Sequence, residues 1–417
     1  MKVIVAHPGK QHSYKTAEAL YANNILCKYI TTVYNKPSLF TNIINIFFPL
    51  SVKLKYNQRR SVVLPDSIVE TKCTLLGLIL LYIYKLPINK KIIDLFYKIV
   101  DDRFGIEVAK IAIKMNVDAV IMYDTTCNSC FKYLKEKAPQ IKRIQDVSIA
   151  NRLFMKDNYV CDIVKTNDDG LKLEQIHLWN KKNIFRYKEE IDLTQYFIVA
   201  SQMSKRSIIY TTKCDNNIYV IPYGVTNKLF QSSDIQKEKR VPPLKLIYVG
   251  LICYRKGLHH LLPLVSQTFK DTVELTLVGY YKHDSYLYKT YKDYPNIKFT
   301  GPVNHEELYK YYQEADVFVF PTLGEGYGLV ILEALSCGIP CIVSNLAGGD
   351  DAIEDDKNGF VFEAGNNIDL ANKIQWFIDH PDEINKMSVY CKNTAKQYTW
   401  EKYGQKLCHI VREIIEH

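Results

Sequence analysis

DVFVFPTLGEGYGLVILEALSCGIPCIVSN, residues 316–345, holds two short apolar runs on either side of a glycine-rich loop and a longer apolar stretch. The runs 316–321 and 340–345 have the length and composition of buried β-strands. The stretch that begins near Tyr327 or Gly328 has the length and composition of a buried helix. A strand, a loop, a helix and a further strand form one unit of a parallel sheet, so this stretch predicts an α/β fold.

The same alternation runs through both halves of the 417 residues, which is a length that fits two domains. The stretch between the halves is polar and charged and ends in two prolines, as linkers do. We predict two Rossmann-like, doubly wound parallel-sheet domains at 1–224 and 244–398, a linker at 225–243, and a C-terminal helix at 399–417 that packs back on the first domain. The other strand-like runs are 2–7, 118–124, 196–201 and 218–224 in the first half and 244–250, 273–279 and 297–301 in the second.

The net charge of +9 is unevenly spread. Residues 51–98 carry nine basic and three acidic side chains and include the apolar run TLLGLILLYIY, 74–84. That run is too short to cross a bilayer, which takes about 20 residues. Two readings stay open: a buried helix with a solvated basic rim, or a surface that contacts anionic lipid. No module of a nucleic-acid-binding protein accompanies the charge, so a nucleic-acid partner is not expected.

The cysteines and the first residues predict a cytoplasmic protein. MKVIVAHPGK reads as a strand and a turn and lacks the pattern of a signal peptide. Eleven cysteines are scattered without a disulfide framework, which is typical of a reducing compartment. Cys127 and Cys130 form a lone CxxC with no second pair at metal-binding spacing, so no metal site is expected.

Two stretches of the second half carry residue types that bind anions and hydroxyls. Arg255 and Lys256 follow a strand that ends at Gly250, where cations and helix N–H groups can hold a phosphate, although two surface cations are also common there. Glu325 lies in the expected loop of residues 322–326, and Glu333 lies on the helix. The two carboxylates can accept hydrogen bonds from paired hydroxyls of a sugar or a ribose. Alternatively, Glu325 caps the helix and Glu333 is solvated.

The stretch EGYGLVILE, in which Glu325 and Glu333 are the ends of an E-x7-E signature, resembles the retaining glycosyltransferases of family 4, which have the GT-B fold. The resemblance continues in YVGLICYRKGLHHLL and in EALSCGIPCIVSNLAGGDDAI and covers about 230 residues from roughly 190 onward. It implies a UDP-, GDP- or dTDP-sugar donor. By the same resemblance, Arg255 and Lys256 bind the diphosphate, Glu333 the ribose hydroxyls and Glu325, as a catalytic residue, the donor sugar. The other donor-binding positions implied are Gly9, Gly250, Val303, Gly326, Tyr327, Gly328 and Leu329.

The sequence departs from that family at two positions. Leu251 stands where many members have an arginine, and the first-domain stretch 142–152 lacks their histidine near the donor sugar. Asp146, or less favourably Gln145, occupies that region and is our candidate for the second catalytic residue. For His7 and His12, in HPGKQH, a role near the donor and an ordinary place in the loop remain equally open.

The resemblance implies retaining, metal-independent transfer of a hexosyl group without a cofactor. The acceptor would be a saccharide or a lipid-linked molecule in polysaccharide, lipopolysaccharide or glycolipid assembly. Peripheral contact of residues 42–98 with the inner face of a membrane would fit a lipid-linked acceptor. The alternatives are a sugar-nucleotide epimerase of the same fold, a glycosidase that uses Glu325 and Glu333, and a non-catalytic sugar-binding subunit. Leu251 and the missing histidine favour the last of these.

Overall fold

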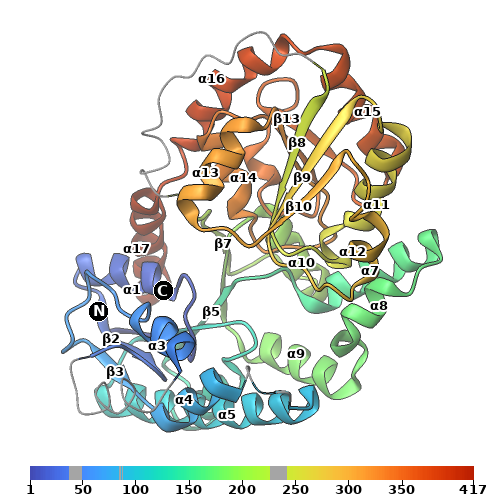
Figure 1. The fold of residues 1–417 in the computed structure, drawn as a ribbon. Coiled ribbons are helices and arrows are strands. Elements are labelled where there is room, and N and C mark those ends of the chain that lie inside the picture. Colours follow the sequence, from blue (N-terminus) through green and yellow to red (C-terminus); the bar gives the residue numbers. More distant parts are fainter. Residues whose placement is uncertain (37–48, 84–85, 87, 226–241) are drawn as a thin grey trace.

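The computed structural model describes residues 1–36, 49–83, 86, 88–225 and 242–417 and shows two parallel-sheet, Rossmann-like domains (Figure 1). Most of the predicted linker, 226–241, and parts of the basic segment, 42–48, 84–85 and 87, lie outside the described residues. The two domains lie one above the other in Figure 1.

The first sheet has seven parallel strands in the order β3-β2-β1-β4-β5-β6-β7. All four runs predicted as strands in this half are strands. Three further strands, β2, β3 and β5, carry no prediction from the sequence. The strands are β1 Val3–Ala6, β2 Leu26–Thr31, β3 Val69–Thr71, β4 Ala119–Tyr123, β5 Lys142–Val147, β6 Tyr196–Val199 and β7 Ile218–Val220.

The second sheet has six parallel strands in the order β10-β9-β8-β11-β12-β13. The five runs predicted as strands in this half form β8 to β12, and the expected α/β architecture is confirmed. The central strands β8, β11 and β12 are almost wholly buried, as expected for a parallel sheet covered on both faces. The strands are β8 Leu244–Val249, β9 Val273–Val278, β10 Ile297–Gly301, β11 Val317–Phe320, β12 Cys341–Ser344 and β13 Gly359–Phe362.

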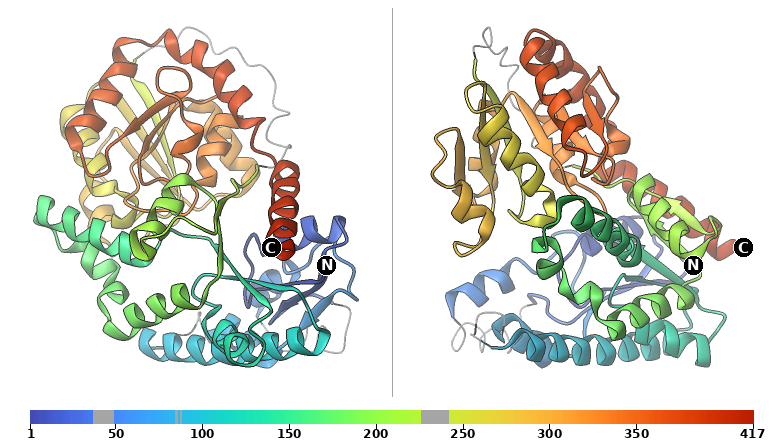
Figure 2. Two further views of the ribbon diagram at one scale, coloured as in Figure 1. Left: turned by 180° about the vertical axis from the view of Figure 1, so that it is seen from behind. Right: turned by 90° about the vertical axis from the view of Figure 1, so that its right-hand side faces the viewer.

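Helices connect successive strands of each sheet (Figures 1 and 2). The first domain contains α1 Ser13–Ala22, α3 Leu50–Asn57, α4 Thr74–Ile83, α5 Lys90–Met115, α6 Asn128–Lys137, α7 Arg152–Thr166, α8 Gly170–Glu174, α9 Lys181–Leu193 and α10 Gln202–Thr212. The second domain contains α11 Leu258–Pro263, α12 Tyr286–Tyr291, α13 His305–Glu314, α14 Leu329–Ser336, α15 Asn367–Asp379 and α16 Glu383–Ala395, and α17 Trp400–Glu416 follows.

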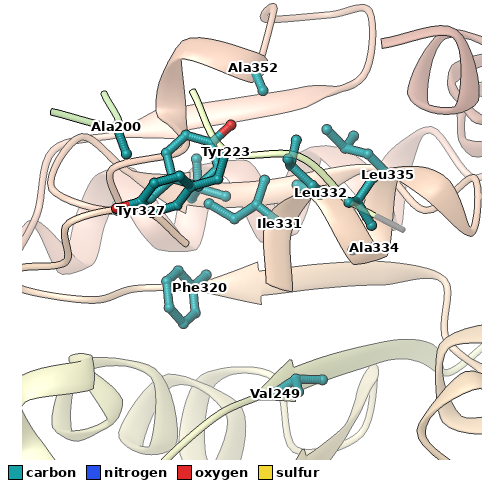
Figure 3. Packing of buried hydrophobic residues seen from close by; sticks show 14 of the residues in the cluster. Ala200, Tyr223, Val249, Phe320, Tyr327, Ile331, Leu332, Ala334, Leu335 and Ala352 are labelled. Carbon is teal, nitrogen blue, oxygen red and sulfur yellow. The ribbon is translucent and has the colours of Figure 1, made fainter. Parts of the chain in front are cut away.

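Helix α14 packs one face into the core of the second domain. Its Ile331, Leu332 and Leu335 are fully buried beside the neighbouring strand β11, where Phe320 lies (Figure 3). Leu329, Val330 and Glu333 are only partly buried. The expectation of a helix buried on all sides is therefore wrong, because one face of α14 remains open to solvent. Glu333 lies on that face and bears no full desolvation cost.

The last helix returns to the first domain. In α17 the residues at spacings of three and four are buried, as in an amphipathic helix. They pack on α1, where Tyr403 and Thr16 share a hydrogen bond of 2.9 Å and Gly404 lies against Ala19 (Figure 1). The chain thus passes from the first domain to the second and back, so both termini belong to the first domain.

The CxxC of the first domain is part of its core. Cys127 precedes α6 and Cys130 lies in its first turn, and both free thiols are fully buried. Burial raises the pKa of each thiol, which keeps both protonated. These cysteines therefore act as packed apolar side chains.

Candidate active site

In each sheet the strand order reverses at one position. In the second sheet the reversal lies between β8 and β11, and in the first it lies between β1 and β4. Loops at the carboxyl ends of such adjacent strands diverge, and in open α/β sheets ligands bind there. The loops that follow β8 and β11 contain Arg255, Lys256 and Glu325. Arg255, Lys256 and Glu325 thus come from the two loops that the topology favours for a ligand.

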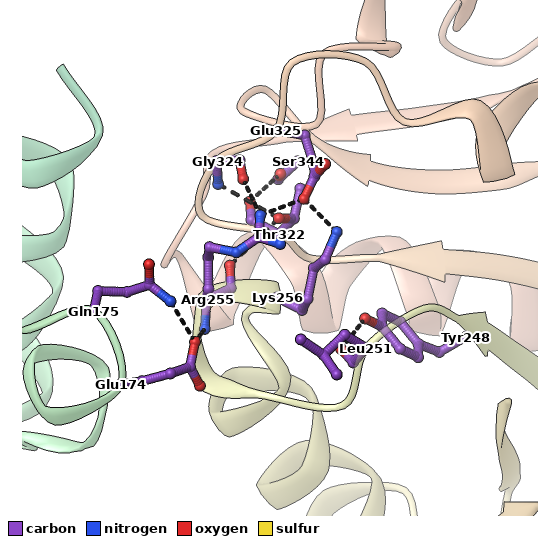
Figure 4. A network of polar contacts seen from close by, with 10 residues as sticks. All are labelled: Glu174, Gln175, Tyr248, Leu251, Arg255, Lys256, Thr322, Gly324, Glu325 and Ser344. Carbon is purple, nitrogen blue, oxygen red and sulfur yellow. Dashed lines mark hydrogen bonds and ion pairs between the residues drawn. The ribbon is translucent and has the colours of Figure 1, made fainter. Parts of the chain in front are cut away.

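Arg255, Lys256 and Glu325 meet directly (Figure 4). Arg255 Nη1 and Lys256 Nζ both donate to the same carboxylate oxygen, Glu325 Oε1. Arg255 Nη1 also donates to the carbonyl of Gly324 at 2.8 Å. The three side chains are 10 to 18% exposed. Two cations thus share one carboxylate in a largely desolvated place, and such paired cations can also receive an anionic ligand.

The pKa shifts follow from this contact. Burial alone would raise the pKa of Glu325, but Lys256 and Arg255 outweigh it and hold that pKa below its ordinary value. Burial lowers the pKa of Lys256, and Glu325 offsets only part of this effect. For Arg255 the attraction of Glu325 outweighs burial and raises the pKa. Glu325 and Arg255 therefore favour their ionised forms, whereas the charge on Lys256 depends on its partner Glu325.

Backbone contacts fix the two loops against each other. Leu323 N–H donates to the carbonyl of Arg255 at 2.9 Å. The Ser344 hydroxyl, at the end of β12, also holds the second loop by donating to the carbonyl of Thr322 at 2.5 Å. Gly257 has φ of +69°, and a Cβ there would lie 1.8 Å from the carbonyl oxygen of Pro321. Only glycine permits so close an approach in this conformation. The cations are thus held on a braced turn, Tyr254–Lys256.

The first domain touches both loops. The Glu174 carboxylate at the end of α8 accepts the N–H groups of Tyr254 at 2.8 Å and Arg255 at 3.1 Å (Figure 4). The carbonyl of Gly326 accepts from Ser201 Oγ at 3.0 Å and Ser204 Oγ at 2.9 Å. The candidate site therefore lies where the two domains meet, and both domains determine its shape.

The backbone of Gly326 also lies very close to the first domain. A Cβ at this position would lie 2.0 Å from the carbonyl oxygen of Ser148, which follows β5. A side chain at position 326 would therefore force the domains apart. The sequence predicts a close approach of Gly326 to a ligand. In the structure this glycine allows the loop to approach the other domain.

Glu333 lies apart from this cluster, in the second turn of α14. Its Oε2 accepts a hydrogen bond of 3.3 Å from Tyr312 OH. The carboxylate is thus oriented by a buried phenol while it remains partly exposed. Glu325 and Glu333 therefore have different partners, so an acid–nucleophile pair of a glycosidase finds no support in their contacts.

In the first domain Asp146 pairs with His12. Asp146 lies on β5 and is 1% exposed, and both its oxygens are 3.1 Å from His12 Nε2. Tyr223 OH lies 2.9 Å from the same nitrogen. The Tyr223 ring is in turn 5.5 Å from that of Tyr327, in the loop of Glu325. His12, from the loop after β1, thus lies beside the stretch 142–152, which lacks the histidine that many members of the resembled family have there.

Other residues predicted from the sequence take defined places. Gly9 N–H donates to His7 Nδ1 at 2.9 Å, and burial lowers the pKa of His7 to about 4. Gly250 directly follows β8, and its N–H donates to the carbonyl of Val278 at 2.9 Å. Gln145, the weaker candidate on β5, is buried and accepts from Thr194 at 3.2 Å. Gly328 and Leu329 open α14, Val303 is partly buried beside the end of β10, and Leu251 is 45% exposed.

A cavity of about 750 Å³ lies elsewhere on the first domain between α5, α6 and α9. Its charged side chains pair with one another, as Arg186 does with Asp102 at 2.9 Å and Lys132 with Glu189 at 3.0 Å. It contains none of the residues predicted to bind a donor. We therefore place the candidate site at the domain contact.

Solved structures with the same arrangement define the class of fold. The chain is similar to the sucrose-phosphate synthase of Thermosynechococcus elongatus, with a TM-score of 0.68, 17% identity and coverage of 100% of this chain and 99% of the other. It is also similar to the lipopolysaccharide outer core galactosyltransferase WaaB, with a TM-score of 0.63, 14% identity and 99% coverage of each chain. The protein has the GT-B fold.

The second domain carries a family match. Residues 230–398 match the family model of the glycosyl transferases group 1. The Arabidopsis thaliana sulfoquinovosyl transferase SQD2 is 27% identical over 227 residues, 52% of this chain and 43% of that protein. The Staphylococcus aureus capsular polysaccharide biosynthesis glycosyltransferase CapM is 27% identical over 232 residues, 50% of this chain and 59% of that protein. The matched parts thus span about half the length of these curated relatives.

Several residues that shape the site carried no signal in the sequence. Glu174 ends α8, Ser204 lies in α10 and Ser201 is the N-cap of α10. Their side chains form hydrogen bonds with backbone groups of the second domain. Tyr312 contacts Glu333 from α13. Ser201 could have been identified as a helix N-cap, but its contact with Gly326 spans 125 positions and follows no local rule.

Proposed function

We propose that the protein is a retaining glycosyltransferase of the family 4 type that moves a sugar from a nucleotide-sugar donor to an acceptor hydroxyl. The observation that carries the proposal is the contact of Arg255 and Lys256 with Glu325 at the switch point of the second sheet, within the matched residues 230–398. The excess positive charge there suits a diphosphate. A UDP donor is the first choice, because the similar Anabaena HepE is described in complex with UDP-glucose.

In this proposal the cations stabilise the leaving diphosphate as its charge develops. The N–H group of Gly328, directly before α14, adds the partial positive charge of a helix N-terminus, and the Leu329 N–H, which donates to the carbonyl of Tyr327 at 3.0 Å, lies beside it. Glu325 accepts hydrogen bonds from the donor sugar, and Glu333 holds the ribose hydroxyls. Departure of the diphosphate oxygen on the face where the acceptor enters lets that oxygen take the acceptor proton. This route retains the anomeric configuration and needs neither an enzymic nucleophile nor a metal.

The test is a screen of UDP-, GDP- and dTDP-sugars by thermal shift, followed by an assay of nucleotide release with and without acceptor. One nucleotide sugar is expected to raise the melting temperature well above the others. Release that depends on an acceptor identifies a transferase. Conversion of the sugar without any acceptor identifies the epimerase alternative. Absence of a shift with every donor would refute the proposal.

Glu333→Ala is expected to lower donor affinity by about 10-fold or more, since the ribose loses a charge-assisted hydrogen-bond partner. Stability should change little, because Glu333 is partly exposed and α14 keeps its buried face. The donor dissociation constant, measured by calorimetry, checks this prediction. Glu314→Gln, at an exposed carboxylate of α13, is the control. An unchanged dissociation constant for Glu333→Ala would remove Glu333 from the site.

Asp146→Asn is expected to reduce the turnover number by about 100-fold, while donor affinity changes less. We propose that Asp146 orients His12 beside the donor sugar. Asparagine removes the carboxylate that holds His12 but keeps the shape of the side chain. His12→Gln should then show a similar loss, and the double variant no further one. Additive losses in the double variant would show that the two residues act separately.

We also propose that a lipid-linked acceptor is used at a membrane surface, on the cytoplasmic side. No helix within the described ranges is long and apolar enough to cross a bilayer. The helices α3, α4 and α5 instead expose large apolar side chains. Of these helices, α4 and α5 lie at the edge of the first domain remote from the second (Figures 1 and 2). Exposed Lys55, Lys91 and Lys98 lie among them. The exposed apolar residues are Leu50, Leu54, Leu75, Ile92, Leu95 and Ile99.

Vesicle binding distinguishes the two readings of this segment. The protein is expected to co-sediment with anionic vesicles at low salt and less with neutral ones. Leu75→Asp combined with Leu95→Asp should abolish sedimentation, since both side chains are more than 60% exposed. Val389→Asp, an equally exposed site on α16, should have no effect. No sedimentation of the unmodified protein at low salt would leave the segment as a solvated rim.

A further inference from the structure

Two adjacent histidines of the second domain converge on one carboxylate of the first domain. Asp162 lies on α7, and His259 and His260 lie on α11. His259 Nε2 is 2.9 Å from Asp162 Oδ2, and His260 Nε2 is 2.7 Å from Asp162 Oδ1. The three side chains are 4 to 7% exposed. This cluster lies outside the candidate active site and has no part in the proposed reaction.

A hydrogen bond outside the cluster fixes the orientation of His260. Its Nδ1 lies 2.7 Å from Asn367 Oδ1. With the amide oriented in this way, an oxygen that only accepts requires a proton on Nδ1. The Nε2 of a neutral His260 then turns a lone pair toward an oxygen of Asp162, so two acceptors face each other. A cation between them, either a proton or a metal ion, removes this conflict.

His259 completes a set of three ligand atoms. All three lie within 4.8 Å of one another. Its Nδ1 is buried and has no hydrogen-bond partner in the described part of the chain, so the ring makes its polar contact through Nε2 alone. Two imidazole nitrogens and one carboxylate oxygen form a ligand set that suits Zn²⁺ and neighbouring first-row ions.

We propose that Asp162, His259 and His260 bind a divalent transition-metal ion of the zinc class between the two domains. Bonds of about 2.0 to 2.2 Å in a tetrahedral arrangement separate ligand atoms by roughly 3.3 Å. The observed 2.7 and 2.9 Å join the two histidines to different oxygens of Asp162, so the contact at the oxygen that binds the ion must open by about half an ångström. Small side-chain rotations achieve this. Asn367 orients His260 as an outer-shell partner does, and water fills the fourth position.

The ion would fasten α7 to α11 beside the proposed donor site. The Tyr254 ring, at the start of the turn that carries Arg255 and Lys256, lies 4.9 Å from the ring of His259. A metal here holds the domains in the arrangement that brings Glu174 to that turn. The ion would act on domain opening and not on the reacting atoms. This inference does not depend on the proposed transferase activity.

The test uses the full chain without a polyhistidine tag, freed of metal by chelation and titrated with Co²⁺ and then Zn²⁺. We expect one Co²⁺ per chain with the intense visible absorption of a tetrahedral site, and displacement by Zn²⁺. Saturating Zn²⁺ should raise the melting temperature by at least about 3 °C. Neither readout requires a substrate or activity.

Asp162→Asn and His260→Gln are expected to remove both the absorption and the thermal shift. His409→Gln, an exposed histidine of α17, should keep them. A shift that survives both variants places the metal elsewhere and overturns the proposal. Absence of Co²⁺ absorption in the unmodified protein overturns it as well and leaves a shared proton as the cation. Because the unmodified protein supplies the spectrum, the proposal stays testable even if a variant fails to fold.

Discussion

Glu325→Gln should lower the rate of sugar transfer by about 100-fold to 1,000-fold. Glutamine keeps the size of the side chain but loses the charge on which Arg255 and Lys256 both converge. The two cations are then buried against each other, and the amide is a weaker acceptor for the sugar hydroxyls. Steady-state rates of nucleotide release at saturating donor and acceptor measure the effect.

The same substitution should also lower stability, since it leaves buried cations unpaired. Breaking a buried ion pair costs about 3 to 5 kcal/mol, and the lower end is expected because these side chains are 10 to 18% exposed. Glu314→Gln on the surface of α13 serves as the matched control and should change neither rate nor stability. Transfer by Glu325→Gln within a few-fold of the unmodified protein would show that Glu325 does not contact the donor.

Lys256→Met is the second large effect. Methionine fills nearly the same space, so Glu325 retains Arg255 as a partner and the fold is preserved. The diphosphate, however, loses a buried cation in a place of low polarity. We expect kcat/KM to fall by about 100-fold or more, and the thermal shift with the preferred nucleotide sugar to disappear.

Lys310→Met, at an exposed lysine of α13, is the control for this substitution and should retain both readouts. A retained thermal shift in Lys256→Met together with a lost turnover would place Lys256 in the chemical step only. Retention of both would show that the donor diphosphate binds elsewhere in the protein.

The architecture could be predicted from the sequence because short apolar runs followed by turn residues mark the strands and loops. The apolar runs before Gly250 and Pro321 are strands, and the residues directly after them form the loops that meet. The meeting of Arg255 and Lys256 with Glu325 follows from the rule that carboxyl ends of neighbouring parallel strands lie together. Strand β5 carries no prediction because its sequence, KRIQDV, contains charged residues. Arg143 and Asp146 can be buried there because they form hydrogen bonds with residues 50 and 134 positions away in the sequence.

The degree of burial and the contacts between domains could not be predicted. The apolar run around Glu333 suggests a helix buried on every side, yet Leu329 and Val330 share its open face. Which apolar face is covered depends on the neighbouring elements and not on periodicity. The cluster of Asp162 with His259 escapes any spacing rule, because 97 positions separate the two residues. Contacts of this kind depend on how the domains meet.

The central claim is that Arg255, Lys256 and Glu325 receive the diphosphate of a nucleotide sugar between the two domains. A crystal structure with the nucleoside diphosphate selected by the donor screen tests it most directly. The account predicts phosphate oxygens about 2.7 to 3.2 Å from Lys256 Nζ and from the N–H groups of Gly328 or Leu329. A diphosphate bound away from these residues, with Lys256 still paired only to Glu325, would contradict it.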